Sequence, residues 1–163
     1  MRRYLITAFA CITLSVVMVM PAQSKEHAPN SKTRCIVCGM FVAKYPMWLA
    51  SLSLETGERI YFDGVKDMMA FFFAPEAFGK KKENKIIQLE VRDYYKQKSI
   101  DGKTAFYVIG SDVLGPMGHE LIPFASMPAA ENFLKDHHGT EILSFSTITH
   151  ERISSMRTGH MMK

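Results

Sequence analysis

A repeated order of elements constrains the fold of this chain more than any other feature of its sequence. Hydrophobic periodicity and turn residues predict strands over 48–54 and 59–62, a helix over 65–73, a strand over 86–95, strands over 105–109 and 119–124, a helix over 128–138 and a strand over 140–145. Each half is under about 70 residues, which is too small for an independent core. We therefore expect an α+β fold of two related ββαβ units, 34–100 and 101–149, packed together through mixed or antiparallel sheets.

The first 24 residues have the composition of a secretory signal peptide. Two arginines precede an apolar run over 4–20, and the small residues after this run predict cleavage before Lys25. We expect a periplasmic mature protein that begins with a flexible polar leader over 25–33. Membrane attachment is expected only if the signal stays uncleaved, because its run is close to the ~18 residues that span a bilayer, or if Cys11 is lipidated.

Charge and composition argue against nucleic acid as a partner. The formal charge of +4 falls to +2 without the two arginines of the signal, and basic residues gather only at 80–82. Nine of the 12 methionines lie beyond the signal. Three of these, together with His160, lie in a polar Met/His tail over 150–163 that we expect to be disordered. We expect a monomer or a weak dimer.

Met117 and His119, separated by one glycine in GPMGHE, are the first candidate metal ligands. In an extended segment, residues two apart project from the same face, so both side chains can meet one ion. The neighbouring glycines and proline favour a tight, accessible loop. Thioether and imidazole groups, with a thiolate, form a soft ligand set that favours Cu(I). The alternative is that Met117 packs in a core and His119 hydrogen-bonds a neighbour.

Cys35 and Cys38 form a CxxC pair that is followed by Met40. A zinc site needs four ligands, and the sequence has no second CxxC and no His-x₃₋₅-His pair. A thioredoxin-like pair lies at a helix start, which the residues after Cys38 do not predict. A structural disulfide and copper ligation both stay open for the cysteines, while Met40 either adds a thioether or fills a core. Because thioethers do not form disulfides, we rank Met117 and His119 above the cysteines.

The sequence holds none of the common catalytic motifs. A Ser-His-Asp arrangement, a phosphate-binding loop and a dinucleotide fingerprint are all missing, so we expect no enzyme. Asp63 is expected to cap the first helix, and His137 and His138 are expected to cap the end of the second. The alternative class of function is a periplasmic thiol–disulfide oxidoreductase that uses the CxxC pair.

Four segments together resemble the NosL family, the exported copper-binding accessory proteins of nitrous oxide reductase assembly. They are CIVCGMFVAKYP, YFDGVKDMMAFFF, AFYVIGSDVLGPMGHELIPF and AENFLKDHHG, and they follow the order of the family. The resemblance implies a pair of related ββαβ units. It also implies a copper chaperone of denitrification that delivers Cu(I) to the copper centres of nitrous oxide reductase. The implied partners are copper-delivery and reductase-maturation proteins of that system.

The chain departs from the family pattern at one position. Many members carry a lipoprotein cysteine just past the signal, and that cysteine can also serve as a ligand. This chain has no cysteine between Ser24 and Cys35. Most Cu(I) sites need a third donor, so we expect it from Cys35, Cys38, Met40 or a ligand outside the chain.

Overall fold

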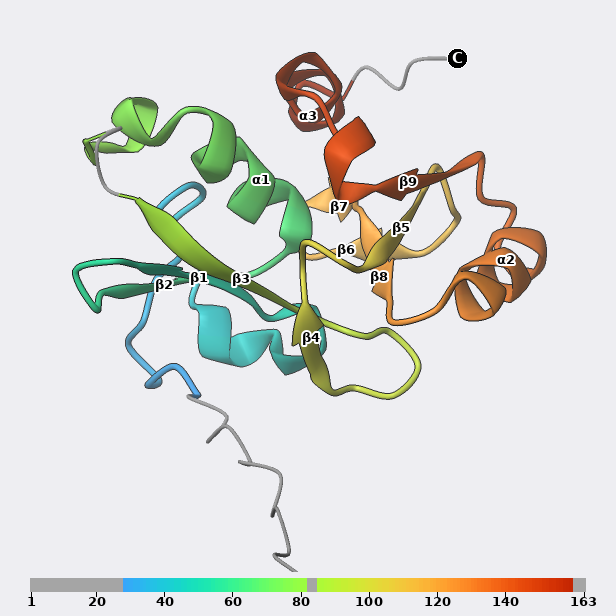
Figure 1. The fold of residues 1–163 in the computed structure, drawn as a ribbon, viewed down its shortest axis with the longest axis horizontal. Helices are drawn as coiled ribbons and strands as arrows, with labels where there is room; N and C mark the ends of the chain where they lie inside the picture. The colour runs from blue at the N-terminus through green and yellow to red at the C-terminus, as the bar shows by residue number, and fades with distance from the viewer. Residues whose placement is uncertain (1–27, 82–84, 160–163) are drawn as a thin grey trace, which may run out of the picture.

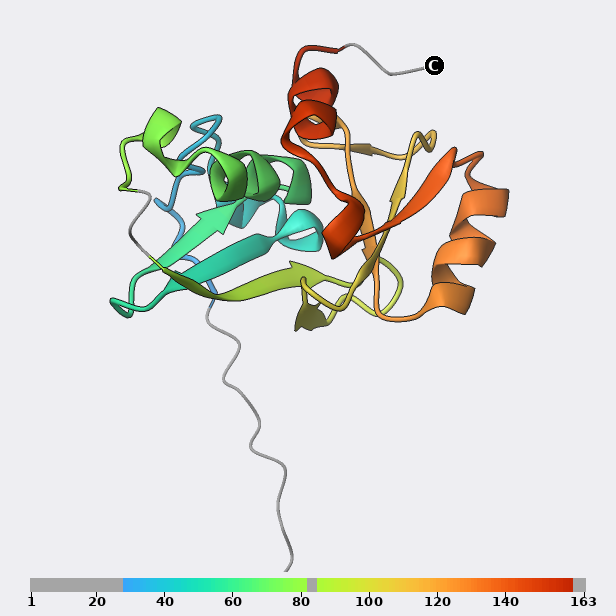
Figure 2. The ribbon, with the colours of Figure 1, turned by 45° about the horizontal axis from the view of Figure 1, so that its top comes forward.

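The computed structural model describes residues 28–81 and 85–159, so the predicted signal and the first three residues of the predicted leader lie outside the described residues. A four-stranded and a three-stranded sheet lie side by side in it, with a two-stranded hairpin and the helices packed around them (Figures 1 and 2). The elements are β1 (Ala50–Leu54), β2 (Arg59–Phe62), α1 (Val65–Phe73), β3 (Ile86–Arg92), β4 (Ser99–Asp101), β5 (Phe106–Ile109), β6 (Leu114–Gly115), β7 (Gly118–His119), β8 (Ile122–Phe124), α2 (Met127–Asp136), β9 (Glu141–Ser144) and α3 (His150–Arg157), with 3₁₀ helices at Val42–Lys44, Pro46–Trp48, Pro75–Phe78 and Phe145–Thr147. None of the described helices is long and apolar enough to cross a membrane.

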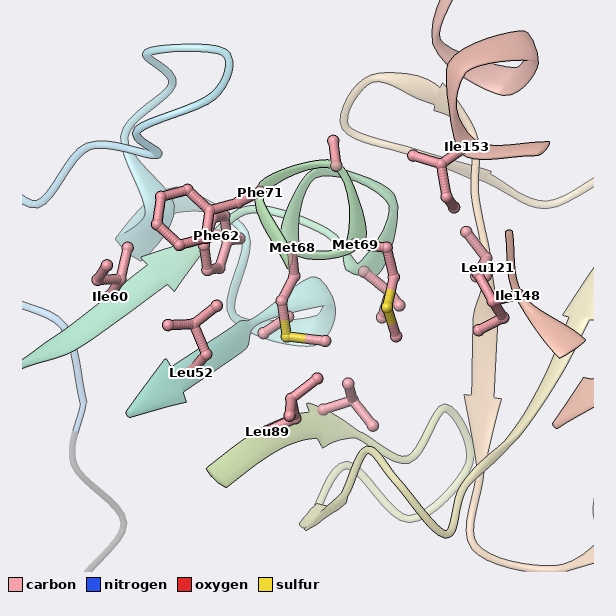
Figure 3. Close-up of a cluster of buried hydrophobic side chains, with 14 of the residues drawn as sticks. Leu52, Ile60, Phe62, Met68, Met69, Phe71, Leu89, Leu121, Ile148 and Ile153 are labelled. Carbon is pink, nitrogen blue, oxygen red and sulfur yellow. The ribbon is translucent and has the colours of Figure 1, made fainter. Parts of the chain in front are cut away.

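The first sheet has the strand order β2-β1-β3-β4 and is antiparallel throughout. Its registers place Ile60 and Leu89 on either side of Leu52. Helix α1 lies across this face and packs Met68 and Phe71 against it (Figure 3). All five side chains are at most 7% exposed, so helix and sheet form two layers around one apolar interior.

The second sheet has the strand order β8-β5-β9 and is also antiparallel. Helix α2 packs against it through Ala130 and Phe133. The helix ends where His138 adopts a left-handed φ of 55° and the Gly139 N–H donates to the Leu134 carbonyl at 2.8 Å. His137 occupies the C-cap position, where its N–H donates to the Phe133 carbonyl at 2.9 Å, so the histidine pair ends the helix as predicted, through backbone geometry.

One apolar core joins the two halves. Met69 of α1 lies near Leu121, Ile148 and Ile153 from the second half of the chain (Figure 3). The predicted α+β class is confirmed. The first half has the order β1, β2, α1, β3, and the second has β5, β8, α2, β9 with the short β6–β7 hairpin inserted between β5 and β8. Strand β4 spans the predicted boundary at residue 100 and pairs with β3, so the first sheet continues slightly past it.

Two predicted strands are shorter than expected because side-chain carboxylates accept backbone N–H groups. Strand β3 ends at Arg92, since Asp93 accepts the N–H of Lys96 at 2.7 Å and starts a turn. The predicted strand over 119–124 is divided into β7 and β8. Between them, the Glu120 carboxylate accepts the N–H of Leu121 at 2.9 Å, which withdraws that group from strand pairing.

The prediction of a disordered tail is wrong for residues 150–159, because this segment contains α3. Thr149 caps the helix by accepting the N–H of Arg152 at 3.2 Å. Ile153 is 1% exposed and packs into the shared core, while Met156 is partly buried against it. The helix was missed because a single buried isoleucine in a polar segment gives almost no hydrophobic periodicity. The predicted Met/His cluster over 160–162 lies outside the described residues.

Candidate metal centre

The two cysteines lie in a short loop that closes on itself before the first sheet begins. The Cys35 N–H donates to the Met40 carbonyl at 2.8 Å, and the Gly39 N–H donates to the Cys35 carbonyl at 2.9 Å. Gly39 has a φ of 79°, which an L-residue with a side chain adopts only at a cost. The loop therefore depends on the glycine of CIVCGM, and it turns both cysteine side chains towards α1.

Two aspartates face this cysteine loop. Asp63 follows β2 directly, and Asp67 lies in the first turn of α1. The Cys38 Sγ donates to Asp63 Oδ1 at 3.1 Å, and the Cys35 Sγ donates to Asp67 Oδ2 at 3.5 Å. Four potential ligand atoms, one from each of these residues, lie within 4.8 Å of one another. We call this group the Cys/Asp cluster.

Three of the four residues of the Cys/Asp cluster are buried. Cys35, Asp63 and Asp67 are each at most 4% exposed, and Cys38 is half-buried. Asp63 Oδ2 is buried without a hydrogen-bond partner among the described residues. An unpaired buried carboxylate oxygen is costly, and a bound cation is one way to satisfy it.

The thiols of the cluster hold their protons tightly. Burial raises the pKa of Cys35 to about 12, with a further contribution from the Asp63 carboxylate. Burial also raises the pKa of Cys38, and Asp63 and Asp67 add to that rise. Burial raises the pKa of Asp67 as well. A cation that enters the cluster must therefore displace thiol protons, and the two thiolates so formed would be soft sulfur ligands beside two harder oxygens.

Met117 and His119 lie on a separate hairpin, formed by β6 and β7. Pro116 and Met117 form its turn, because Gly115 pairs with Gly118 and Leu114 pairs with His119. Gly118 has a φ of 82°, as expected for the glycine that follows such a turn. The structure thus differs from the extended segment assumed from the sequence, since Met117 lies in the turn and only His119 in a strand.

The two candidate ligands of this hairpin differ in exposure. Met117 is 48% exposed at the tip. The His119 side chain is half-buried, and its Nδ1 is buried without a hydrogen-bond partner among the described residues. An accessible thioether and an imidazole are both donor types that suit a soft metal ion. The assignment of Met117 and His119 as ligands stays a prediction, as does that of Met40, which is half-buried.

The structure brings together some of the predicted ligands and adds two that the sequence did not single out. Cys35 and Cys38 meet in one cluster, whereas His119 is not part of it. Asp63 was expected to cap α1, but the capping position is Gly64 and Asp63 faces Cys38 instead. The available signal was the spacing in DGVKD, which places carboxylates four residues apart at the start of the helix.

Both cysteines of the pair are free thiols, so the structural disulfide left open by the sequence is not formed in this structure. A redox-active cysteine needs an exposed thiol with a lowered pKa. Here Cys35 is 1% exposed and the pKa of both thiols is raised. The geometry therefore does not favour the thiol–disulfide oxidoreductase alternative.

Comparison with known proteins identifies the family. The curated copper-binding lipoprotein NosL of Stutzerimonas stutzeri is 25% identical over 145 residues, which cover 81% of this chain and 72% of that protein. The crystal structure of the copper chaperone NosL from Shewanella denitrificans matches with a TM-score of 0.66 at 24% identity, over 81% of this chain and 99% of that one. The solution structure of apo-NosL from Achromobacter cycloclastes matches with a TM-score of 0.47 at 28% identity, over 64% of this chain and 87% of that one. The NosL family model matches residues 26–153, and the chain belongs to the NosL family.

Proposed function

We propose that this protein is an exported, non-enzymatic carrier of Cu(I) that supplies copper for the maturation of nitrous oxide reductase copper centres. Its family membership supports copper as the cargo, because the relative from S. stutzeri is named a copper-binding lipoprotein and the one from S. denitrificans a copper chaperone. The observation that carries the proposal is the β6–β7 hairpin, which exposes the Met117 thioether at its turn and carries, two residues later, a half-buried imidazole with a nitrogen that is unpartnered in the described part of the chain.

The chemistry of the hairpin suits reversible transfer of a monovalent ion. A thioether is a neutral donor that binds without losing a proton, and a neutral imidazole does the same. Because Met117 is 48% exposed, an acceptor protein can add its own ligand to the ion before the carrier releases it. The cysteines are less suited to rapid release, since their raised pKa requires proton uptake and release at each step. In this proposal Met117 and His119 are the exchangeable ligands, and Cys35, Cys38 or Met40 supplies a further donor.

The proposed location is the periplasm. Its support is the signal-like composition of the first 24 residues and the word lipoprotein in the name of the curated relative. The proposed partners are copper-delivery and reductase-maturation proteins of the nitrous oxide reductase system, which would contact the tip of the hairpin. Membrane anchoring would follow from an uncleaved or lipidated signal.

A competitive Cu(I) titration against a chromophoric chelator tests the proposal. We expect one Cu(I) per monomer and at least a 10-fold loss of affinity in both Met117→Ala and His119→Ala. Met47→Ala is the matched control, because Met47 is 52% exposed but lies outside the hairpin. Wild-type affinity in the Met117→Ala/His119→Ala double variant would refute the assignment. Insulin reduction by the same sample would instead support the oxidoreductase alternative.

A further inference from the structure

Lys66 is a buried cation that joins α1 to the Met117–His119 hairpin. The residue is 3% exposed. Its Nζ donates to the carbonyl oxygens of Met117 and His119, both at 2.7 Å. Burying an ammonium group is costly unless its donors are used, and here two of the three are bonded to carbonyls that flank Gly118. The side chain therefore bridges the two carbonyls on either side of Gly118.

Glu120, which follows the hairpin, makes a further contact with the start of α1. Its Oε1 accepts the backbone N–H of Lys66 at 2.6 Å, which is one of the first N–H groups of α1 and has no partner within the helix. The close approach depends on Gly64, because a Cβ at that position would lie 2.2 Å from Glu120 Oε2. Lys66 thus makes three hydrogen bonds to the segment 117–120, one from its backbone and two from its side chain.

The first turn of α1 also carries Asp67, whose carboxylate accepts a hydrogen bond from the Cys35 thiol. One short helical segment therefore contacts both the Cys/Asp cluster and the hairpin. Figure 1 shows the hairpin of β6 and β7 beside the first turn of α1. A hairpin with two residues in each strand is only marginally stable by itself, so its conformation depends on contacts with the rest of the protein, of which this is one.

We propose that Lys66 is a positioning residue for the copper ligands Met117 and His119, an inference that rests on the proposed function. Its ammonium group holds the two carbonyls at a fixed separation and so selects one conformation of the turn. The thioether and the imidazole are then presented together before the ion arrives. Loss of groups that orient metal ligands typically lowers metal affinity by about 10–100-fold, and we expect an effect of that size here.

Lys66→Met tests this inference, because methionine has nearly the same length and no donor. The control is Val108→Ala, which weakens the second core away from the hairpin and should lower the thermal midpoint without touching the turn. The first readout is the ¹³C-labelled methyl resonance of Met117 in the copper-free protein. We expect one sharp signal in the wild type and in Val108→Ala, and a shifted or broadened signal in Lys66→Met.

The second readout is Cu(I) affinity, for which we expect a loss of about 10–100-fold in Lys66→Met and little change in Val108→Ala. Partial recovery in Lys66→Arg, which keeps the charge and the donors, would support positioning over general stability. If Lys66→Met does not fold, hydrogen exchange of the hairpin amides in the wild type tests the inference instead. A hairpin that Lys66 holds in place must exchange its amide protons more slowly than a free loop. An unchanged Met117 signal with wild-type affinity in Lys66→Met, or free-loop exchange in the wild type, would overturn the inference. Should the wild type bind no Cu(I) at the hairpin, the proposed function fails, while the methyl signal still reports whether Lys66 orders the turn.

Discussion

Replacing Glu120 by glutamine should change how the stability of the copper-free protein depends on pH. Burial raises the pKa of this carboxyl from 4.5 to about 8, although N–H bonds from Leu121 and Lys66 and the Lys66 charge act in the opposite direction. The folded state therefore keeps the Glu120 proton at neutral pH, whereas the unfolded chain releases it near its ordinary pKa.

The direction of the pH dependence follows from this difference in proton binding. Because the folded state binds the additional proton, stability is greatest below the unfolded pKa and falls as the pH rises through the folded one. The slope is about 1.4 kcal/mol per pH unit while only the folded state is protonated. For a pKa of about 8, Glu120 removes about 2.5 kcal/mol of stability between roughly pH 5.5 and 7.5.

Urea denaturation at these two pH values measures the effect. Glu120→Gln cannot ionise, so subtracting its change in unfolding free energy from that of the wild type removes the titration of other groups. We expect the wild type to lose about 2.5 kcal/mol more than the variant. Glu131→Gln, at an exposed position of α2, is the control and should behave as the wild type. Equal pH dependence in the wild type and Glu120→Gln would refute the reasoning that burial dominates.

Three further predictions concern the same framework. Cd(II), used as a thiophilic probe, should bind the two cysteine thiols with an apparent affinity that rises by up to about 100-fold per pH unit, because two protons must leave on binding. The thiolate-to-metal absorbance measures this binding, and an absorbance that does not depend on pH would contradict the prediction. Gly64→Ala should cost about 1–3 kcal/mol in urea denaturation, because its Cβ would lie 2.2 Å from Glu120 Oε2, and a Glu120→Ala background should remove most of that cost. Ile153→Ala should cost about 2–4 kcal/mol, whereas Ser154→Ala on the exposed side of α3 should cost far less, and equal effects would show that α3 adds nothing to the core.

The strand and helix order was predictable because each element carries its own periodicity. The turn at 55–58 separates two alternating runs, and β1 and β2 form the expected hairpin. The apolar face of α1 and the Pro-containing segment after it place the helix within one residue of its observed bounds. These signals are local, so they can be recognised in the sequence without knowledge of the tertiary fold.

The candidate site was only partly predictable. The spacing of Cys35 and Cys38 indicated that both thiols serve one site, and the cluster bears out their proximity. The partners of these thiols, Asp63 and Asp67, are 25 and 32 residues away along the chain, and their own spacing does not indicate which cysteines they meet. The same holds for Lys66, which contacts the hairpin across more than 50 residues.

The amino-acid sequence by itself determined the α+β class, the two strand–strand–helix–strand halves and the soft donors that point to copper. Only the tertiary structure decided that the two cysteines face Asp63 and Asp67, that a helix covers the core after residue 149, and that a buried lysine donates to the backbone of the Met117 turn. The physical reason is that secondary structure follows from neighbours within a few residues. A cluster of potential metal ligands and a buried charged side chain instead depend on the separation of distant segments, which is set by how the sheets and α1 pack.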